Sequence, residues 1–387
     1  MPPTGRATTA IHGERPPAAR PVTYPIYQTA AFAVETNDDY AHLNDFESEA
    51  YFYTRYDNPT LRSAAAKLAA LEGAETGLLF ASGMNAITTV LLALLSSGDT
   101  LAASNTLYGG TQVFLRDYAP RCGWRVRFLS EEQLYDLERH APEARVVYFE
   151  TPTNPRADCI AIRRVVEAAR RTGALVVKDN TFATPINQTP LALGVDLVIH
   201  SATKYLGGHS DITLGAVVGS RERLLPVFAA RKIFGGVASP HDAFLLDRSL
   251  KTLELRMAQH NANALALATF LQAQPQVRQV FYPGLPDSPG HAVAREQMRG
   301  YGGMLCMALE NLDAARALCD RLRLALNVAH LGTAETLVSI PVLTSHASLT
   351  PDELARAGLT PGMVRISAGL ENIEDLIADF QQALTAV

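Results

Sequence analysis

The residues of this chain best suited to covalent chemistry lie where predicted strands end. Lys204 follows the apolar run 196–199 and stands among hydroxyls and glycines in the stretch 200–211. A lysine just past a buried strand can form an imine with an aldehyde, provided that its amine is partly deprotonated. Most lysines are instead solvated surface charges, so the surroundings must decide between these two interpretations.

Four further polar clusters follow other predicted strands, at Ser82-Gly83, Tyr108, Asn154 and Asp179. A carboxylate at a buried strand end, as at Asp179, needs a cationic or hydrogen-bonded partner. The strand, small-residue turn and helix around Gly83 form a geometry that offers backbone N–H groups to a phosphate. Ligands of open α/β sheets bind at the carboxyl ends of the strands, so the clusters predict one shared catalytic site.

This set of residue types matches pyridoxal 5′-phosphate (PLP), whose protein partners are a Schiff-base lysine and an acidic residue at the pyridine nitrogen. Tyr108 is suited to stack on the ring. Phosphate donors are expected from Gly83, Met84, Ser201 and Thr203, with Tyr53 and Arg55 adding to them. Arg55 lies among four aromatic residues, so a stacked structural role and an anion-binding role are both open.

The elements that must position these residues alternate between strands and helices, which implies an α/β fold with a parallel sheet wrapped by helices. Three parts are expected: an N-terminal arm (1–57), a PLP-binding domain (58–250) and a smaller C-terminal α+β domain (251–387). Pro16, Pro17, Pro21 and Pro25 favour an extended arm. A long helical region is predicted from near 242 to about 273, strands at 304–309 and 363–367, and helices at 314–324 and 373–387.

The bulk properties are those of an ordinary soluble globular protein that binds a small molecule. The 387 residues are 48% hydrophobic and 19% charged, with a net charge of −5, which gives no reason to expect nucleic acid or an anionic membrane. The four scattered cysteines show no metal spacing and predict reduced thiols, hence a cytoplasmic location and no metal. No signal peptide is evident, and the longest apolar stretch, 90–95, is far below the ~20 residues that span a bilayer.

A resemblance can be named on motifs that run nearly end to end. The chain resembles the Cys/Met-metabolism family of fold-type I PLP enzymes, which have the aspartate-aminotransferase-like fold and include cystathionine γ-synthase, cystathionine γ-lyase and methionine γ-lyase. The matching motifs are Tyr24-Pro25-Ile26-Tyr27-Gln28-Thr29, Tyr53-Thr54-Arg55, Ala81-Ser82-Gly83-Met84, Leu107-Tyr108-Gly109-Gly110-Thr111, Glu150-Thr151-Pro152-Thr153-Asn154-Pro155, Asp179-Asn180-Thr181, the stretch 200–211, Leu250-Lys251-Thr252-Leu253 and Val364-Arg365-Ile366-Ser367.

The resemblance implies a role for each residue. Lys204 would hold PLP and move the Cα proton, and Tyr108 would stack on the ring and assist proton transfer. Arg365 would bind the substrate α-carboxylate with its planar fork. The active unit would be a dimer, paired into a homotetramer, because Tyr53 and Arg55 reach the phosphate of the neighbouring subunit. The implied cofactor set is Lys204, Asp179, Tyr108, Gly83, Met84, Ser201, Thr203, Asn154, Thr181, Tyr53 and Arg55, with Asp179 at the pyridine nitrogen and Asn154 at the ring hydroxyl.

The implied substrate-binding set is Arg365, His330, Gly110 and Leu331, and here the chain departs from its relatives. Gly110 stands where methionine γ-lyases carry a cysteine. Ala329 and His330 stand where the cystathionine-handling relatives show Glu-Ser. His330 either contacts a polar γ-substituent or only fills the entrance.

The expected reaction is PLP-dependent γ-elimination from an L-amino acid with a leaving group on Cγ. The alternative is γ-replacement, as in cystathionine γ-synthase or O-acyl-homoserine sulfhydrylase, and a β-lyase and a non-catalytic PLP-binding protein are more remote. His209-Ser210-Asp211 contains the residue types of a catalytic triad, but neighbours on one turn cannot adopt that geometry. His200 is expected to pack at its strand end, and Cys122 and Trp124 in a helix-to-strand connection.

Overall fold

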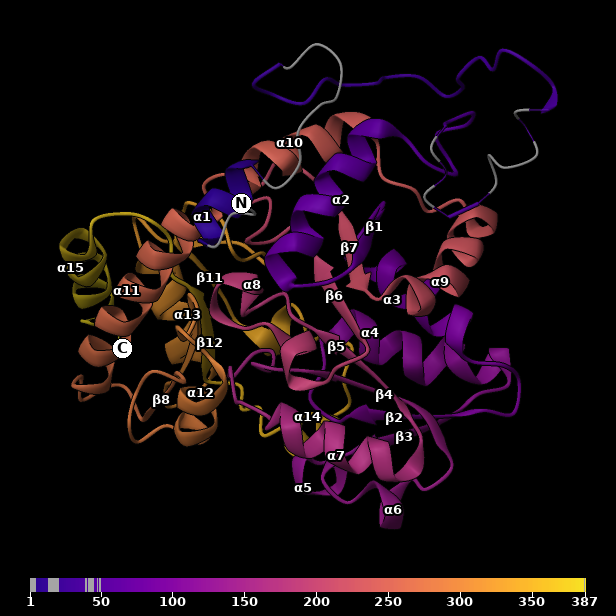
Figure 1. Ribbon diagram of the computed structural model, residues 1–387. Coiled ribbons are helices and arrows are strands. Elements are labelled where there is room, and N and C mark those ends of the chain that lie inside the picture. The colour runs from indigo at the N-terminus through magenta and orange to yellow at the C-terminus, as the bar shows by residue number, and fades with distance from the viewer. Residues whose placement is uncertain are drawn as a thin grey trace. The chain divides into compact units, whose positions relative to one another are not determined.

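The structure is a computed structural model that describes residues 5–12, 21–38, 40, 45–46, 48, 50–385 and 387 (Figure 1). It divides into two compact units, unit 1 with Met1–Leu95 and Thr189–Glu254, and unit 2 with Ser96–Gln188 and Leu255–Val387. Within the described ranges, every helix is too short or too polar to cross a lipid bilayer.

Three buried strands form the sheet portion of unit 1, in the order β1 (Thr76–Phe80), β7 (Gly215–Gly219) and β6 (Leu197–Ser201). β7 runs antiparallel to both of its neighbours, with Thr76 opposite Gly219 and Ser201 opposite Gly215. These strands are apolar and almost wholly buried, as in a core strand covered on both faces. The helices of this unit are α1 (Arg6–His12), α2 (Pro59–Glu72), α3 (Gly83–Leu94), α9 (Arg221–Phe234) and α10 (Pro240–Leu250), with a 3₁₀ turn at Pro190–Leu193.

The N-terminal arm is partly helical. The prediction of an extended arm is wrong at Arg6–His12, which forms α1 and buries Ala10 completely. Residues 21 to 34 follow the prediction, since their one β contact is a bridge from Ala31 to Tyr53. Pro16 and Pro17 lie outside the described residues.

The first sheet portion of unit 2 is wholly parallel, in the order β5 (Leu175–Asp179), β4 (Ala144–Glu150), β2 (Thr100–Ser104) and β3 (Arg125–Leu129). Parallel strands carry their carboxyl ends to one edge, and the register places Glu150 opposite Asp179 there. The accompanying helices are α4 (Gly109–Val113), a π-helix (Phe114–Tyr118), a 3₁₀ helix (Ala119–Cys122), α5 (Glu131–Leu134), α6 (Leu137–His140), α7 (Ile162–Thr172) and α8 (Thr184–Asn187).

A second sheet of unit 2 has the order β10 (Leu326–Asn327), β11 (Leu337–Ser339), β12 (Met363–Ser367), β9 (Met304–Ala308) and β8 (Gln279–Phe281). Its apolar side chains join those of the neighbouring helices in one buried core. Helices α11, α13 and α15 gather beside this sheet in Figure 1. The helices are α11 (Leu253–Gln272), α12 (His291–Gln297), α13 (Leu312–Arg321), α14 (Pro351–Arg356) and α15 (Ile373–Leu384), with a 3₁₀ turn at Pro341–Leu343.

The long helix predicted from 242 to 273 is two helices. α10 ends at Leu250 and α11 begins at Leu253, and the N–H of Thr252 closes a turn on Ser249 O at 3.2 Å. In the last part of the chain, β12 covers the predicted strand 363–367, and α13 and α15 lie within the predicted helical stretches to within two residues.

All four cysteines carry no disulfide. Cys159, Cys306 and Cys319 are buried, and burial raises the pKa of each thiol to about 12. Cys122 ends the 3₁₀ helix, and Trp124 is buried just before β3, as expected for a connection between helix and strand.

Candidate active site

The turn between β1 and α3 leaves no room for a side chain. A Cβ atom at Gly83 would lie 2.8 Å from Ser201 Cβ and 2.9 Å from Ser201 Oγ, so only glycine permits this approach of α3 to the end of β6. Ser82 caps the helix by accepting the Asn85 N–H at 3.1 Å. The N–H groups of the first helical turn have no acceptor within the helix, and they favour an anion.

Lys204 stands on a tight turn directly after β6. Its N–H donates to Ser201 O at 3.1 Å, and its carbonyl accepts from Gly208 N at 2.7 Å. The Thr203 hydroxyl accepts the Leu214 N–H at 2.9 Å, which ties the turn to the start of β7. Unit 1 therefore places the Gly83 turn against Ser201, and it carries Thr203 and Lys204 on the turn that follows Ser201.

Tyr53 and Arg55 meet on an exposed part of unit 1. The Arg55 guanidinium lies 5.3 Å from the Tyr53 ring centroid and 4.9 Å from that of Tyr56. It also donates to the Lys232 carbonyl. Both residues line a hollow of about 360 Å³ together with residues 28–30 and 235–240. The Arg55 guanidinium is thus in contact with two aromatic rings and also lies beside the hollow, so both roles stay open.

The carboxyl ends of β4 and β5 carry the acidic groups of unit 2. Asp179 Oδ1 accepts the Thr181 N–H at 2.8 Å, which supplies the hydrogen-bonded partner that its position demands. Glu150 was not among the predicted site residues, although it ends β4. Both of its carboxylate oxygens lie 3.0 Å from the Tyr108 N–H. Burial raises the pKa of Glu150 well above its usual value, and the nearby Asp179 charge raises it further.

Tyr108 caps α4 and leaves 44% of its surface exposed. The next two residues, Gly109 and Gly110, let neighbouring atoms lie where a Cβ atom would otherwise be. A Cβ atom at Gly109 would lie 1.9 Å from the Ser345 carbonyl oxygen, and one at Gly110 would lie 2.6 Å from Tyr108 Cε1. Glycine at position 110 therefore lets the Tyr108 ring fold back over the start of its own helix.

Arg365 on β12 is buried, with 3% of its surface exposed. Its Nη1 donates to Asn154 Oδ1 and its Nη2 to the His330 carbonyl, each at 3.2 Å. The structure thus brings Arg365, Asn154 and His330 together, with His330 contributing its backbone. Leu331, next in the chain, is buried. A guanidinium fixed in this way presents the planar fork that suits a carboxylate.

The predicted site residues are divided between the two units. Unit 1 holds Tyr53, Arg55, Gly83, Met84, Ser201, Thr203 and Lys204, and unit 2 holds Tyr108, Gly110, Asn154, Asp179, Thr181, His330, Leu331 and Arg365. Sequence reasoning missed Glu150 and His346, a buried histidine of unit 2 that contacts Leu107 and Asn154. For Glu150 the signal was present, since it is a carboxylate at a buried strand end. For His346 the sequence offered none.

The remaining polar candidates have structural contacts. The exposed His209 ring meets Gly207 O at 2.7 Å and Ser249 Oγ at 3.3 Å, in agreement with a structural role for His209-Ser210-Asp211. His200 is fully buried, and its Nε2 lies 2.7 Å from Glu72 Oε1. Packing at the strand end is therefore confirmed for His200.

Comparisons with known proteins identify the family and the fold of the chain. The model of a family described as Cys/Met metabolism PLP-dependent enzyme matches residues 7–385. The chain is 46% identical over 388 residues to L-methionine gamma-lyase from Pseudomonas putida, covering 99% of this chain and 98% of that protein.

Two solved structures share the fold. Cystathionine gamma synthase from Xanthomonas oryzae pv. oryzae, in complex with aminoacrylate and cysteine, has a TM-score of 0.94 and 37% identity, covering 99% of this chain and 98% of that one. A Campylobacter jejuni protein assigned as an O-acetylhomoserine (thiol)-lyase contains N′-pyridoxyl-lysine-5′-monophosphate. This structure has a TM-score of 0.94 and 31% identity to the chain, and the match covers 99% of this chain and 100% of that one.

Proposed function

Because the chain belongs to the Cys/Met-metabolism family of PLP-dependent enzymes, we propose that it is a lyase that eliminates a leaving group from Cγ of an L-amino acid. The observation that carries this proposal is the buried Arg365 guanidinium, whose planar fork suits a substrate carboxylate. The same chain carries Lys204 directly after a buried strand. The full-length likeness to an L-methionine gamma-lyase favours elimination.

The residues of the chain fit PLP. The Gly83 turn and the Ser201 and Thr203 hydroxyls are suited to its phosphate, since a helix N-terminus and hydroxyl donors favour an anion. Asp179 is suited to the pyridine nitrogen and Asn154 to the ring hydroxyl. Met84 and Thr181 would contribute backbone and side-chain contacts beside them, and Lys204 would hold the aldehyde carbon.

Bound PLP withdraws electrons from the substrate and so makes loss of its Cα proton possible. The Lys204 amine would take the Cα proton and pass it on, and would then be free to take a Cβ proton. The Tyr108 hydroxyl donates a proton to the leaving group, and Glu150 holds the Tyr108 backbone in place. Arg365 binds the α-carboxylate, while Gly110, His330 and Leu331 border the space for the γ-substituent.

The test is a panel of γ-substituted amino acids, namely L-methionine, L-cystathionine and O-acetyl-L-homoserine, assayed with and without added thiol. Elimination releases 2-oxobutanoate and ammonia from each substrate that is accepted, with or without thiol. The matched control is Lys204→Ala, which should release none. A chain that forms only thiol adducts, and no 2-oxo acid, would show that elimination is the wrong assignment.

The second candidate is γ-replacement, favoured by the likeness to cystathionine gamma synthase. In that case a thiol takes the place of the leaving group, and adducts outnumber 2-oxobutanoate in the same assay. The partition between the two products decides between them, because both reactions share the steps up to departure of the leaving group.

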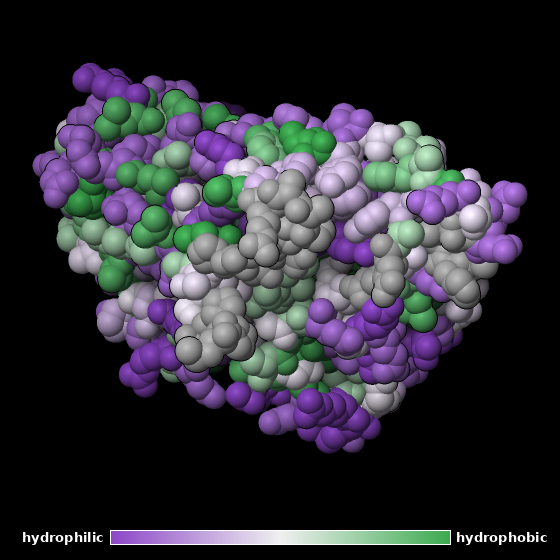
Figure 2. All heavy atoms as spheres, turned by 45° about the horizontal axis from the view of Figure 1, so that its top comes forward, coloured by the Kyte–Doolittle hydropathy of each residue, from purple (hydrophilic) through white to green (hydrophobic). Residues whose placement is uncertain are grey.

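We also propose that the active unit is a dimer, paired into a homotetramer, with Tyr53 and Arg55 reaching the phosphate bound by the neighbouring chain. Tyr53 is 38% exposed, and α9 exposes Leu225, Ile233 and Phe234, at 53%, 76% and 54%. Figure 2 brings the top of Figure 1 forward and shows green apolar areas among the purple polar ones. Exposed apolar side chains beside a charged hollow are typical of a subunit interface.

Mixing two inactive variants tests the shared site. An Arg55→Ala chain keeps Lys204, and a Lys204→Ala chain keeps Arg55, so a mixed dimer regains one intact site if the two residues come from different chains. Partial recovery of activity after subunit exchange is expected. An absence of recovery in verified mixed oligomers would place Arg55 and Lys204 in the same chain's site.

The proposed location is the cytoplasm, which suits four cysteines without disulfides. The proposed functional parts are the arm (1–57), the PLP-binding domain (58–250) and the C-terminal domain (251–387). Proteolysis of the native protein, with sequencing of the first fragments, would test these boundaries, since linkers between domains are cut first.

A further inference from the structure

His346 lies in the segment between the 3₁₀ turn at Pro341–Leu343 and α14. The side chain is 2% exposed, and its Nδ1 lies 2.8 Å from Ser345 Oγ. The backbone is fixed as well, because the His346 N–H donates to Pro341 O at 2.9 Å and its carbonyl accepts from Leu349 N at 3.1 Å. Neither the ring nor its backbone has freedom to relocate without breaking several hydrogen bonds.

The ring bridges two parts of the proposed substrate site. The ring lies close to the backbone of Leu107, the residue before Tyr108, and to the backbone of Asn154. The Asn154 side chain in turn accepts from Arg365. One imidazole therefore touches the segments that carry the stacking tyrosine and the partner of the carboxylate-binding arginine.

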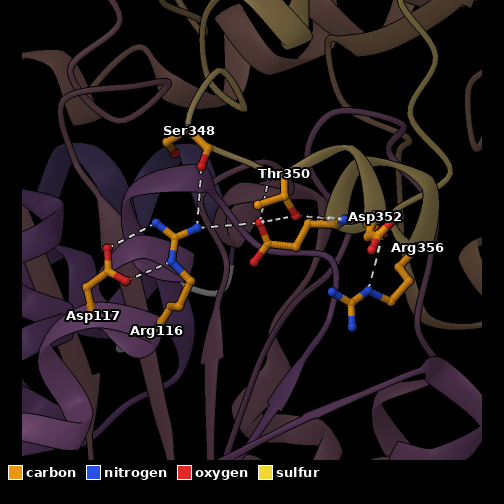
Figure 3. A network of polar contacts seen from close by, with 7 residues as sticks. Arg116, Asp117, Ser348, Thr350, Asp352 and Arg356 are labelled. Atoms are coloured by element: carbon orange, nitrogen blue, oxygen red, sulfur yellow. Dashed lines mark hydrogen bonds and ion pairs between the residues drawn. The ribbon is translucent and has the colours of Figure 1, made fainter.

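The segment that carries His346 also contacts the Tyr108 turn at Gly109 and the helix that follows this turn at Arg116. The Ser345 carbonyl packs against Gly109 so closely that a Cβ atom there would lie 1.9 Å from the oxygen. Arg116, one turn beyond α4, donates to Ser348 O at 3.3 Å and to Glu353 Oε2 at 3.4 Å (Figure 3). The Thr350 hydroxyl and the Thr350 N–H both donate to the same Glu353 oxygen, and these bonds are part of the network in Figure 3.

His346 is neutral at physiological pH. Burial, and next the positive charge of Arg365, lower its pKa to about 4. A neutral ring beside Arg365 does not compete with a substrate carboxylate for the guanidinium, and it presents one N–H donor and one acceptor nitrogen. Arg365 is the charged group that acts on the ring.

We propose that His346 is a positioning residue that fixes the Tyr108 turn relative to Asn154 and Arg365, and so aligns the stacking and carboxylate-binding groups of the substrate site. The proposal rests on the function proposed above, since Tyr108 and Arg365 take their roles from it. His346 itself need touch neither substrate nor cofactor.

Two substitutions separate positioning from simple packing. His346→Leu keeps a side chain of similar size but removes every ring hydrogen bond, whereas His346→Gln retains an amide that can donate and accept. We expect His346→Leu holoenzyme to retain its PLP, to raise KM about tenfold and to lower kcat about tenfold, as for misplaced catalytic groups. His346→Gln should recover a measurable part of both losses.

The matched control is His260→Leu. His260 is equally buried in unit 2 and bonds the backbone of Ala368 through Nδ1 at 2.7 Å. Both leucine variants should lower the melting temperature to a similar extent, but only His346→Leu should change KM and kcat per bound PLP. Should His346→Leu fail to fold, Ser345→Ala removes only the hydroxyl on Nδ1, and a two- to threefold rise in KM is expected.

Binding without turnover keeps this test separate from the reaction assignment. L-Norvaline has no leaving group on Cγ, and calorimetry measures its affinity for the holoenzyme whichever reaction the enzyme catalyses. An increase of about tenfold in its dissociation constant for His346→Leu supports the positioning role. Wild-type values of KM, kcat and norvaline affinity in folded His346→Leu would overturn it, and loss of PLP in step with activity would assign the residue to the cofactor site instead.

Discussion

The cofactor cradle of unit 1 (Gly83, Ser201, Thr203 and Lys204) and the substrate side of unit 2 (Tyr108, Gly110, Asn154, His346 and Arg365) are built in different ways. The cradle depends on backbone contact, since Gly83 lies against Ser201 with no space for a Cβ atom. The substrate side depends on side chains that hold other side chains, as Asn154 holds Arg365. A backbone contact tolerates almost no substitution, whereas side chains can shift. We therefore expect substitutions on the substrate side to be tolerated better than substitutions in the cradle.

The largest effect is expected from breaking the cradle with Gly83→Val. Its Cβ would lie 3.0 Å from Ser201 Cα and closer still to Ser201 Cβ, so α3 or β6 must move. We expect nearly complete loss of bound PLP, with about 1–3 kcal/mol of destabilisation from overpacking. The absorbance of bound PLP per chain and the melting temperature measure the two effects.

The control for the cradle is Gly173→Ala, at the end of α7. Gly173 has φ of +76° and open space around it, so alanine strains the backbone without a collision. It should cost about 1 kcal/mol and leave PLP content unchanged. Full PLP occupancy in Gly83→Val would contradict the cradle.

A smaller loss is expected from Arg365→Lys on the substrate side. Lysine cannot reproduce the planar fork, so kcat/KM should fall about 100-fold while bound PLP stays at its wild-type level. Arg316→Lys, with 52% of its side chain exposed, is the control and should behave as wild type. An equal fall in PLP content would mean that Arg365 serves the cofactor.

Gly110→Ala should have a still smaller effect. The new methyl group collides with the Tyr108 ring, whose exposed position lets it swing aside, so the free energy of unfolding should change by less than about 0.5 kcal/mol. Displacement of the ring should lower kcat about tenfold. A double-mutant cycle with Tyr108→Phe checks the cause, because strong non-additivity is expected if both changes act through one ring. Additive losses would count against a shared cause.

Mild acid should destabilise unit 2 through two of its buried histidines. His346 and His260 have pKa values of about 4, below the 6.5 of an unfolded histidine, so both are neutral when folded. Unfolding therefore takes up protons below pH 6.5, and the stability that these residues confer is lost as the pH falls from 6.5 towards 4. At pH 5.5 the loss is about 1 kcal/mol per histidine.

Urea unfolding at pH 7.5 and 5.5 measures this acid effect, with His260→Gln as the comparison. The variant should lose less stability than the wild type on acidification, because one of the two proton-binding sites is gone. An equal loss in both proteins would show that His260 does not titrate in this range.

Much of this architecture follows from the sequence because its signals are local. β12 coincides with the predicted strand 363–367, where an apolar run is bounded on both sides. The break between α10 and α11 was not predicted, because Lys251 and Thr252 are compatible with a helix and the turn forms through packing. α1 was missed because a short helix is stabilised by burial of Ala10, which no periodicity reveals.

The positions of Gly83, Asn154, Asp179 and Lys204 were predictable for a similar reason, since each lies at or just after the end of a strand. Contacts between residues that lie far apart in the sequence were not predictable. Glu150 meets Tyr108 across 42 positions of the chain, and His346 meets Leu107 across a longer separation still. Gly110 was noted as a departure from methionine γ-lyases, but its contact with the Tyr108 ring depends on a rotamer that sequence does not specify.

The burial of Cys159, Cys306 and Cys319 has a consequence for the reactivity of these thiols. With a pKa of about 12, each of these side chains is a thiolate in only about one molecule in 10⁵ at pH 7. Exchange requires a thiolate that attacks an existing disulfide, so mixed disulfides with small-molecule disulfides should form slowly at these positions. Burial thereby protects these three side chains from disulfide exchange.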